Sequence, residues 1–321
     1  MILLHNINYE HLYLYKNQFD KAWKLFESRK ETYKFLKSKN KLIIDQTSIA
    51  KEEVILNKKI LVLREQGIGE EILFSSMYND LINLNNNISI ETDKRLMNIF
   101  ERSFKCNLFV PDGYYSKNKE MLKKFDSIIF AGSLCSYFRK NKSNFLNKPY
   151  LIDDINKTAE IQKDPIFKKN DLKIGLSWKS VVSIYGKLKS LNLSDFKSLI
   201  KKNRQFINLQ YGDVDEELKQ KVNQDFDIYS FEKIDLFNDL EYLMSILKNL
   251  DVFITVSNST AHLASAMGVK TFLICTKKSS TYFYWSNENN KSPWYQNVEI
   301  FNIDNSIEEV FKKINESLNN L

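Results

Sequence analysis

Short apolar runs rich in β-branched residues alternate with amphipathic stretches along most of this chain. The clearest unit is residues 251–274, with the sequence DVFITVSNSTAHLASAMGVKTFLI. It contains an apolar run at 252–256, a polar turn at 257–260, a helical stretch of small residues and a second apolar run at 271–274. Strand, turn, helix and strand in this order form the unit of a parallel sheet.

The same alternation predicts two sets of elements. Those of the first set are, in chain order, strand 58–64, helix 70–84, strand 88–92, helix 93–104, strand 107–110 and strand 127–132. Those of the second set are strand 172–178, a helix after Ser194, strand 205–210, a helix from Asp213, strand 227–230, helix 239–250 and the unit at 251–274. Such alternation is typical of doubly wound sheets. The predicted fold class is therefore α/β, with two Rossmann-like halves facing a cleft.

Two further stretches complete the organisation. Residues 9–36 carry apolar side chains at helical spacing, and Asn17-Gln18 is expected to divide them into two helices. The polar stretch 137–170, which contains two prolines, is interpreted as the domain junction. The predicted domains are a helical extension at 1–40, an N-terminal domain at 41–160 and a C-terminal domain at 161–321, whose last helix, 307–318, is expected to pack back toward the N-terminal domain.

Composition and charge limit the possible partners. Of the 321 residues 43% are hydrophobic and 13% aromatic, enough for one large or two medium cores. The net charge is +7, and the lysines form no dense tract with interleaved aromatic residues, so nucleic acid is not an expected partner. The stretch 137–148 is basic, which suits an anionic glycolipid or a membrane surface. Ordinary solubilising charge is the favoured interpretation of this stretch.

The cysteines and the N-terminus indicate a compartment. Cys106, Cys135 and Cys275 lie far apart and show neither metal-ligand spacing nor a disulfide framework, which favours a reducing environment. The start of the chain lacks the features of a signal peptide, and no run approaches the ~20 apolar residues of a membrane span. We therefore expect a cytoplasmic protein, with the inner face of the membrane as a second location.

The polar turn Ser257-Asn258-Ser259-Thr260 is the first candidate site. Its side chains are typical helix caps, and a helix that begins here leaves its first N–H groups available to a phosphate or a nucleotide diphosphate. His262 lies in the first turn of the same helix, where it either donates to a ligand or only packs. A well-capped helix without a ligand is the alternative interpretation.

The first strand runs into EQGIGEEILF, in which Gly67 and Gly69 permit a tight turn and close approach of a ligand. A dinucleotide fingerprint requires a third glycine at position 72, where this chain has Ile72. Glu91 and Asp93 fall near the place of a ribose-binding acid, so a dehydrogenase stays open.

Charged residues follow the first strand of each predicted set of elements. Glu70 and Glu71 either complement the dipole of the helix that they begin or place a general base at the lip of a cleft. Lys179, Lys187 and Lys189 follow the first strand of the second set, and two cations beside a diphosphate would stabilise a leaving group. Each lysine is also compatible with simple solvation. The acidic triplets at 213–215 and 225–227 do not follow strands as a metal-binding pair requires, so no metal site is expected.

Several ordered segments together resemble one family. They are REQGIGEEILFSS (64–76), IGLSWKS (174–180), INLQYGD (207–213), IDLFNDLEYLMSILKNLDVFITVSNSTAHLASAMG (234–268) and SPWYQNVEIF (292–301). The set resembles the GT-B glycosyltransferase domains that follow tetratricopeptide repeats in bacteria. It is more distantly similar to the lipopolysaccharide heptosyltransferases of glycosyltransferase family 9. The resemblance covers roughly residue 9 to the C-terminus, and the helical start resembles the last repeat helices that precede such a domain.

The resemblance implies a nucleotide-sugar donor as co-substrate, no metal or other cofactor, and a protein or glycolipid acceptor on the way to a cell-surface glycan. It places Glu70, beside Gly67 and Gly69 of the acceptor-side loop, as the general base of an inverting transfer, where the heptosyltransferases usually carry Asp. The turn at 257–260 also departs from their pattern, so ADP-heptose specificity is not implied. A nucleotide-sugar epimerase and a non-catalytic GT-B binding module are the alternatives. The implied donor-binding residues are Lys187, Lys189, Gln210, Tyr211, Ser257, Asn258, Ser259, Thr260 and His262.

Overall fold

A computed structural model describes residues 10–30, 47–48, 50–56, 58–146, 148–180, 186–220, 226–276, 283–285, 290–304 and 306–321. The chain divides into two compact units. The first unit comprises Met1–Asn147 with Ser286–Trp294, and the second comprises Lys148–Trp285 with Tyr295–Leu321. Each unit is described by itself.

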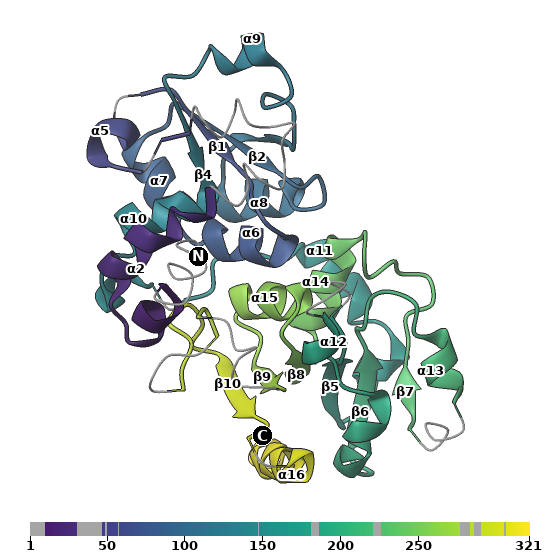
Figure 1. The fold of residues 1–321 in the computed structure, drawn as a ribbon. Helices are drawn as coiled ribbons and strands as arrows, with labels where there is room; N and C mark the ends of the chain where they lie inside the picture. Colours follow the sequence, from purple (N-terminus) through teal and green to yellow (C-terminus); the bar gives the residue numbers. More distant parts are fainter. Residues whose placement is uncertain are drawn as a thin grey trace. The chain divides into compact units, whose positions relative to one another are not determined.

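The first unit contains one parallel sheet (Figure 1). Its elements are α2 (Phe19–Phe26), α5 (Glu52–Ile55), β1 (Ile60–Leu63), α6 (Ile68–Ser75), α7 (Tyr78–Leu84), β2 (Ile88–Thr92), α8 (Met97–Phe104), β3 (Phe109–Pro111), α9 (Lys119–Leu122), β4 (Ser127–Phe130), the 3₁₀ helices η2 (Ala131–Leu134) and η3 (Lys142–Asn144), and α10 (Cys135–Phe138). The strand order is β3-β2-β1-β4, and Ile60 of β1 pairs with Ile88 on one side and Ser127 on the other.

The second unit contains a larger parallel sheet. Its elements are α11 (Ile155–Ile161), the 3₁₀ helices η4 (Pro165–Lys168) and η5 (Leu193–Leu199), β5 (Leu172–Ser177), α12 (Gly186–Lys189), β6 (Arg204–Asn208), α13 (Asp215–Lys219), β7 (Ile228–Tyr229), α14 (Leu240–Lys248), β8 (Val252–Val256), α15 (Ser259–Ala266), β9 (Thr271–Cys275), β10 (Val298–Asn302) and α16 (Ile307–Leu318). The strand order is β10-β9-β8-β5-β6-β7, and Ile174 of β5 pairs with Val252 of β8.

The strand orders explain the hydrophobic pattern. β1, β4 and β8 are buried along their whole length because parallel strands are covered on both faces, so they read as continuous apolar runs. The apolar face of α16, with Val310, Phe311 and Ile314, belongs to the core of the second unit. Its expected packing toward the N-terminal domain stays a prediction, as do the domain boundaries at 40 and 160.

Most predicted elements are present, and the differences have local causes. The helix expected at 70–84 is two helices, because the Ser76 and Met77 amides bond to the carbonyls three residues earlier and tighten the chain. The helix expected from 93 begins at Met97, since the Asp93 carboxylate accepts from the Arg95 amide at 3.0 Å and holds a turn there. The predicted break at Asn17 is confirmed by its positive φ of 57°. The helix expected after Ser194 is the 3₁₀ helix η5. The elements that were not predicted include β10 and the helices α5, α9, α10, α11 and α12.

Candidate functional site

Both sheets have a point at which the strand order reverses. In the second unit the chain enters the sheet at β5, continues outward to β7, and returns to the other side of β5 with β8. In the first unit the reversal lies between β1 and β4. Ligands of open parallel sheets bind at the carboxyl ends of the strands at such a reversal. The residues at and just after the carboxyl ends of β5 and β8 therefore form the best candidate site, called here the β5/β8 site and consisting of Ser177, Lys179, Asn258, Ser259 and Thr260.

Asn258 joins the two sides of the β5/β8 site. Its Oδ1 accepts from the Ala261 amide at 3.0 Å and caps α15. Its Nδ2 donates to Ser177 Oγ at 2.9 Å and to the Lys179 carbonyl at 3.2 Å. Ser259 and Thr260 are the first two residues of α15, so their amides have no intrahelical acceptor, and the Asn258 cap does not use them. The helix start thus directs backbone donors and the positive end of its dipole toward the carboxyl edge, which is the geometry that an anion site needs.

The hydroxyl groups of the turn differ in their use. The Ser257 hydroxyl is buried and accepts a hydrogen bond from Trp285 Nε1 at 2.9 Å. Ser259 is half-buried and Thr260 is buried. Within the described part of the chain, the structure records no hydrogen bond to the hydroxyl of Ser259 or Thr260. These two residues are therefore the better candidates for a ligand contact.

His262 is buried in an aromatic cluster rather than directed into the turn. Its ring centroid lies 4.4 Å from that of Trp285 and 4.8 Å from that of Tyr284. Its Nδ1 lies 3.0 Å from the Tyr295 hydroxyl. Burial, with a smaller effect of Lys189, lowers the pKa of His262 to about 3, so the imidazole is neutral. This geometry favours the packing interpretation, and a donor-binding role for His262 stays a prediction.

Gln210 connects the ends of β5 and β6. Its Oε1 accepts from Ser177 Oγ at 3.1 Å and from the amides of Trp178 and Lys179 at 2.9 and 2.7 Å. Its Nε2 donates to the Tyr211 carbonyl at 2.7 Å. Gln210 thus fixes the backbone of the loop after β5, and any effect on a nucleotide would be exerted through that loop. The Tyr211 ring is buried.

The three candidate lysines have different environments. Lys179 forms an ion pair with Glu217. Burial raises the pKa of Glu217, but its hydrogen bonds with Lys179, Leu193 and Trp178 and the charge of Lys179 outweigh burial, so the pKa is lowered. Lys187 is exposed on α12, whereas Lys189 is half-buried and close enough to His262 to contribute to its pKa shift. Lys189 is consequently the candidate cation that combines partial burial with proximity to α15.

In the first unit, the predicted glycine turn is present at the end of β1. Gly67 is the N-cap of α6, Gly69 is buried, and Gln66 has a left-handed φ of 60°. Glu70 is half-buried in the first turn of α6. Its Oε2 lies 3.2 Å from the position that a Cβ at Gly67 would occupy, so the carboxylate folds over the helix start. We name residues 66–70 the Gly67 turn.

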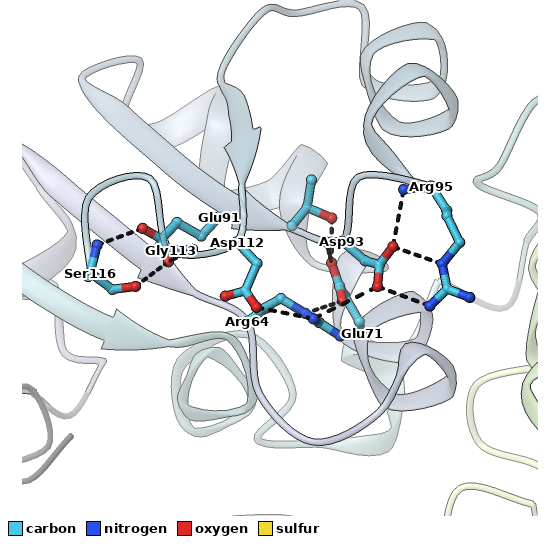
Figure 2. A network of polar contacts seen from close by, with 9 residues as sticks. Arg64, Glu71, Glu91, Asp93, Arg95, Asp112, Gly113 and Ser116 are labelled. Carbon is cyan, nitrogen blue, oxygen red and sulfur yellow. Dashed lines mark hydrogen bonds and ion pairs between the residues drawn. The ribbon is translucent and has the colours of Figure 1, made fainter. Parts of the chain in front are cut away.

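Glu71 lies in a network of polar contacts at the start of α6 (Figure 2). Its carboxylate is 0% exposed and accepts from Arg64 Nε at 2.6 Å, from the Thr92 hydroxyl, and from the Asp93 amide at 2.9 Å. Burial raises the pKa of Glu71, and the Arg64 guanidinium and the hydrogen bonds oppose this effect. Of the two adjacent carboxylates, Glu70 alone is partly exposed.

Glu91 and Asp93, the carboxylates that could bind a ribose, already form hydrogen bonds and ion pairs within the protein. Figure 2 shows Glu91 beside the loop that follows β3, where its oxygens accept from the amides of Gly113, Tyr115 and Ser116 and from the Ser116 hydroxyl, at 2.7–3.1 Å. Asp93 forms an ion pair with Arg95, with 2.9 Å between Asp93 Oδ1 and Arg95 Nε. Glu91 therefore organises a loop, which weakens the dehydrogenase alternative.

The strand reversal of the first unit is filled by protein side chains. Glu65, the second residue after β1, accepts from Arg29 Nε and Nη2 at 2.7 and 2.8 Å and from the Gly132 amide at 2.6 Å. Gly132 follows β4, so one carboxylate spans the reversal. No local pattern pointed to this contact, because Arg29 lies 36 residues before Glu65. The aromatic residues Trp285 and Tyr295 beside His262 were missed for the same reason.

The described residues contain neither a metal-binding cluster nor a helix that could span a membrane. No group of three or more His, Cys, Asp and Glu side chains in this part of the chain is arranged to hold a metal ion. None of the helices described is both long enough and apolar enough to cross a bilayer.

Comparison with known proteins supports the fold. No family model matches the sequence. Protein FlbA of Caulobacter vibrioides is 26% identical over 275 residues, which cover 76% of this chain and 43% of FlbA, so the chain spans less than half the length of this relative. A glycosyl transferase family 9 structure from Veillonella parvula has a TM-score of 0.58 at 13% identity, covering 85% of this chain and 92% of that one.

The E. coli ADP-heptose lipopolysaccharide heptosyltransferase II has a TM-score of 0.55 at 12% identity, covering 82% of this chain and 99% of that one. At such low identities the likeness concerns the fold alone. The chain accordingly shares the Rossmann-like α/β fold of these glycosyltransferase structures, with parallel sheets in both of its units.

Proposed function

We propose that this chain is a glycosyltransferase that transfers a sugar from a nucleotide-sugar donor, and that the donor diphosphate binds at the β5/β8 site. One observation carries the proposal: the capped start of α15 lies at the strand reversal of the second sheet, with the amides and hydroxyls of Ser259 and Thr260 beside it. A diphosphate satisfies such amides and complements the helix dipole. The shared fold with glycosyltransferase structures is consistent with this placement.

The proposed reaction is an inverting displacement without a metal ion. An acceptor hydroxyl attacks the anomeric carbon, the bond to the diphosphate oxygen breaks with its electron pair, and the nucleoside diphosphate leaves. Glu70 takes the proton of the acceptor hydroxyl, since it is the partly exposed carboxylate at the end of β1. The amides of α15 and a lysine, Lys187 or Lys189, stabilise the departing charge.

The acceptor is proposed to be a protein or a glycolipid saccharide of the cell surface. The name of heptosyltransferase II associates that protein with lipopolysaccharide. The resemblance to tetratricopeptide-linked domains suggests protein acceptors. The basic stretch 137–148 suits peripheral contact with an anionic membrane, in keeping with a cytoplasmic enzyme at its inner face. The Arg139 of this stretch is engaged in an ion pair with Asp80 at 2.8 Å, so the remaining lysines would supply that contact.

Titration and turnover test the proposal. Calorimetry with ADP, UDP, GDP and NAD should show binding of one nucleoside diphosphate and no tight binding of NAD. Release of the same diphosphate from a panel of nucleotide sugars should persist in excess chelator. Strict dependence on added divalent metal would refute the mechanism, and tight NAD binding alone would indicate an epimerase or dehydrogenase. Diphosphate binding without turnover of any donor would indicate a binding module.

A further inference from the structure

We propose that Arg29 and Arg64 are positioning residues that hold the Gly67 turn from its two ends and so fix Glu70 for catalysis. The proposal rests on the proposed role of Glu70 as the base. It goes further because it makes the N-terminal helical segment a part of the catalytic apparatus. The argument begins with the two carboxylates that flank the turn, Glu65 and Glu71.

Arg29 holds the first end of the turn. It follows α2 and reaches Glu65 with two parallel hydrogen bonds at 2.7 and 2.8 Å, and its Nη2 also donates to Ser133 Oγ at 3.1 Å. Its Nη1 donates to the Phe26 carbonyl at 3.0 Å, and its guanidinium lies 4.0 Å from the centre of the Phe26 ring. Both side chains of the ion pair are almost fully buried. These contacts fix the orientation of the Arg29 guanidinium, and its two parallel hydrogen bonds fix the position of the Glu65 carboxylate.

Arg64 holds the second end (Figure 2). Its Nε donates to Glu71, which follows Glu70 directly, and its Nη1 lies 3.3 Å from Asp112 and 3.8 Å from Asp93. Glu71 also accepts from Thr92 at the end of β2. The start of α6 is thereby attached to the ends of β2 and β3, independently of Arg29.

Between these two attachments the chain contains a strained residue and a partly exposed carboxylate. Gln66 adopts a left-handed φ of 60° although it is not a glycine, a conformation that costs energy unless its surroundings impose it. Glu70 lies at the end of the turn and is half-buried, whereas Glu65 and Glu71 on either side are buried. A catalytic group misplaced by about 1 Å can lose on the order of 100-fold in rate, so two fixed ends are what a base on a short turn requires.

The chain offers a matched control. Arg139 is another buried arginine of the first unit, paired with Asp80 at 2.8 Å and donating to the Ser76 carbonyl at the far end of α6. It is similarly buried and ion-paired, but it bonds to neither Glu65 nor Glu71, the two residues that flank the Gly67 turn. Arg139→Lys therefore measures what the loss of a buried arginine costs when the turn is left alone.

The first experiment is independent of activity. Amide hydrogen exchange by NMR would follow Glu71, whose N–H donates to the Gly67 carbonyl at 3.0 Å, and Gly132, whose N–H donates to Glu65. In Arg29→Lys, a single ammonium cannot reproduce the parallel pair of hydrogen bonds. The Gly132 amide should exchange about tenfold faster or more in Arg29→Lys, and the Glu71 amide should do so in Arg64→Lys, whereas Arg139→Lys should leave both unchanged. Equal exchange in the wild type and all three variants would overturn the proposal.

The second experiment measures donor turnover with water or an acceptor, in a double-mutant cycle with Glu70→Gln. Arg29→Lys and Arg64→Lys should each lower kcat by about tenfold or more, with the KM for the donor and the affinity for the nucleoside diphosphate within about twofold. In the Glu70→Gln background neither should have a further effect, because they act through Glu70. Additive effects, or an equal loss of kcat in Arg139→Lys, would overturn positioning.

The outcomes separate this inference from the proposed function. If the wild type binds no nucleoside diphosphate and turns over no donor, the proposed function fails, and hydrogen exchange still decides whether the arginines hold the turn. If turnover is present and the cycle is additive, the function holds and the inference fails. If Arg29→Lys does not fold, the paired variant Arg29→Met, Glu65→Met, which removes both charges of this ion pair, replaces it.

Discussion

Replacing Asn258 by alanine should destabilise the second unit in a way that can be calculated from its contacts. The side chain makes three hydrogen bonds: one caps α15 at the Ala261 amide, and two reach Ser177 and the Lys179 carbonyl across the strand reversal. Asn258 is 7% exposed, so water has little access to the groups that the substitution would leave unpaired.

The expected magnitude follows from these bonds. Loss of a helix cap costs about 1 kcal/mol, and each of the other two hydrogen bonds contributes about 1 kcal/mol. Asn258→Ala should therefore lower the free energy of unfolding by about 3 kcal/mol, or the melting temperature by about 6–12 °C for a unit of this size. Asn258→Asp keeps the cap acceptor and loses both donors, so its loss should be about 2 kcal/mol.

Thermal unfolding and calorimetric titration of both variants would check the reasoning. Asn258→Asp should be the more stable of the two variants but should bind nucleoside diphosphate more weakly than Asn258→Ala, because a carboxylate at position 258 repels a diphosphate. A loss of less than about 2 °C in Asn258→Ala would show that the cross-link is not energetically significant. If Asn258→Asp binds nucleoside diphosphate as tightly as the wild type, the turn is not an anion site.

Three further predictions concern single residues. Thr260→Val removes a hydroxyl that bonds to no described residue, so it should weaken diphosphate binding about tenfold or more with little change in melting temperature; unchanged affinity in titration would contradict a donor contact. The pKa of His262 is lowered from 6.5 to about 3 in the folded chain. As the pH falls below 6.5, the imidazole therefore takes up a proton in the unfolded chain but not in the folded one. Stability should thus drop by about 2 kcal/mol between pH 7 and 5, and urea unfolding of His262→Gln should lack this part of the slope. Gly132→Ala would place a Cβ 2.6 Å from Glu65 Oε1, so the free energy of unfolding measured in urea should fall by about 1–3 kcal/mol. An unchanged free energy of unfolding would show that the Glu65 carboxylate can move aside.

The elements of this fold could be predicted because their signals are local. The strands at β2 and β8 and the helix α16 have the predicted bounds, since a buried parallel strand reads as an apolar run and an exposed helix as an amphipathic one. The cap at Asn258 is equally local, because a cap bonds to an amide three residues away. β10 escaped prediction because only part of it is buried, so its sequence has no continuous apolar run.

The sequence alone determined where most of the strands lie, and therefore that polar turns would follow β1, β5 and β8. It could not determine which charges in those turns are used internally. Glu70 and Glu71 are adjacent and chemically alike, and only the packing of α6 against β2 buries one and leaves the other partly exposed. The contact between Arg29 and Glu65 likewise joins segments that no local periodicity relates. Periodicity records the face on which a side chain lies, whereas its partner across the sheet is decided by tertiary packing.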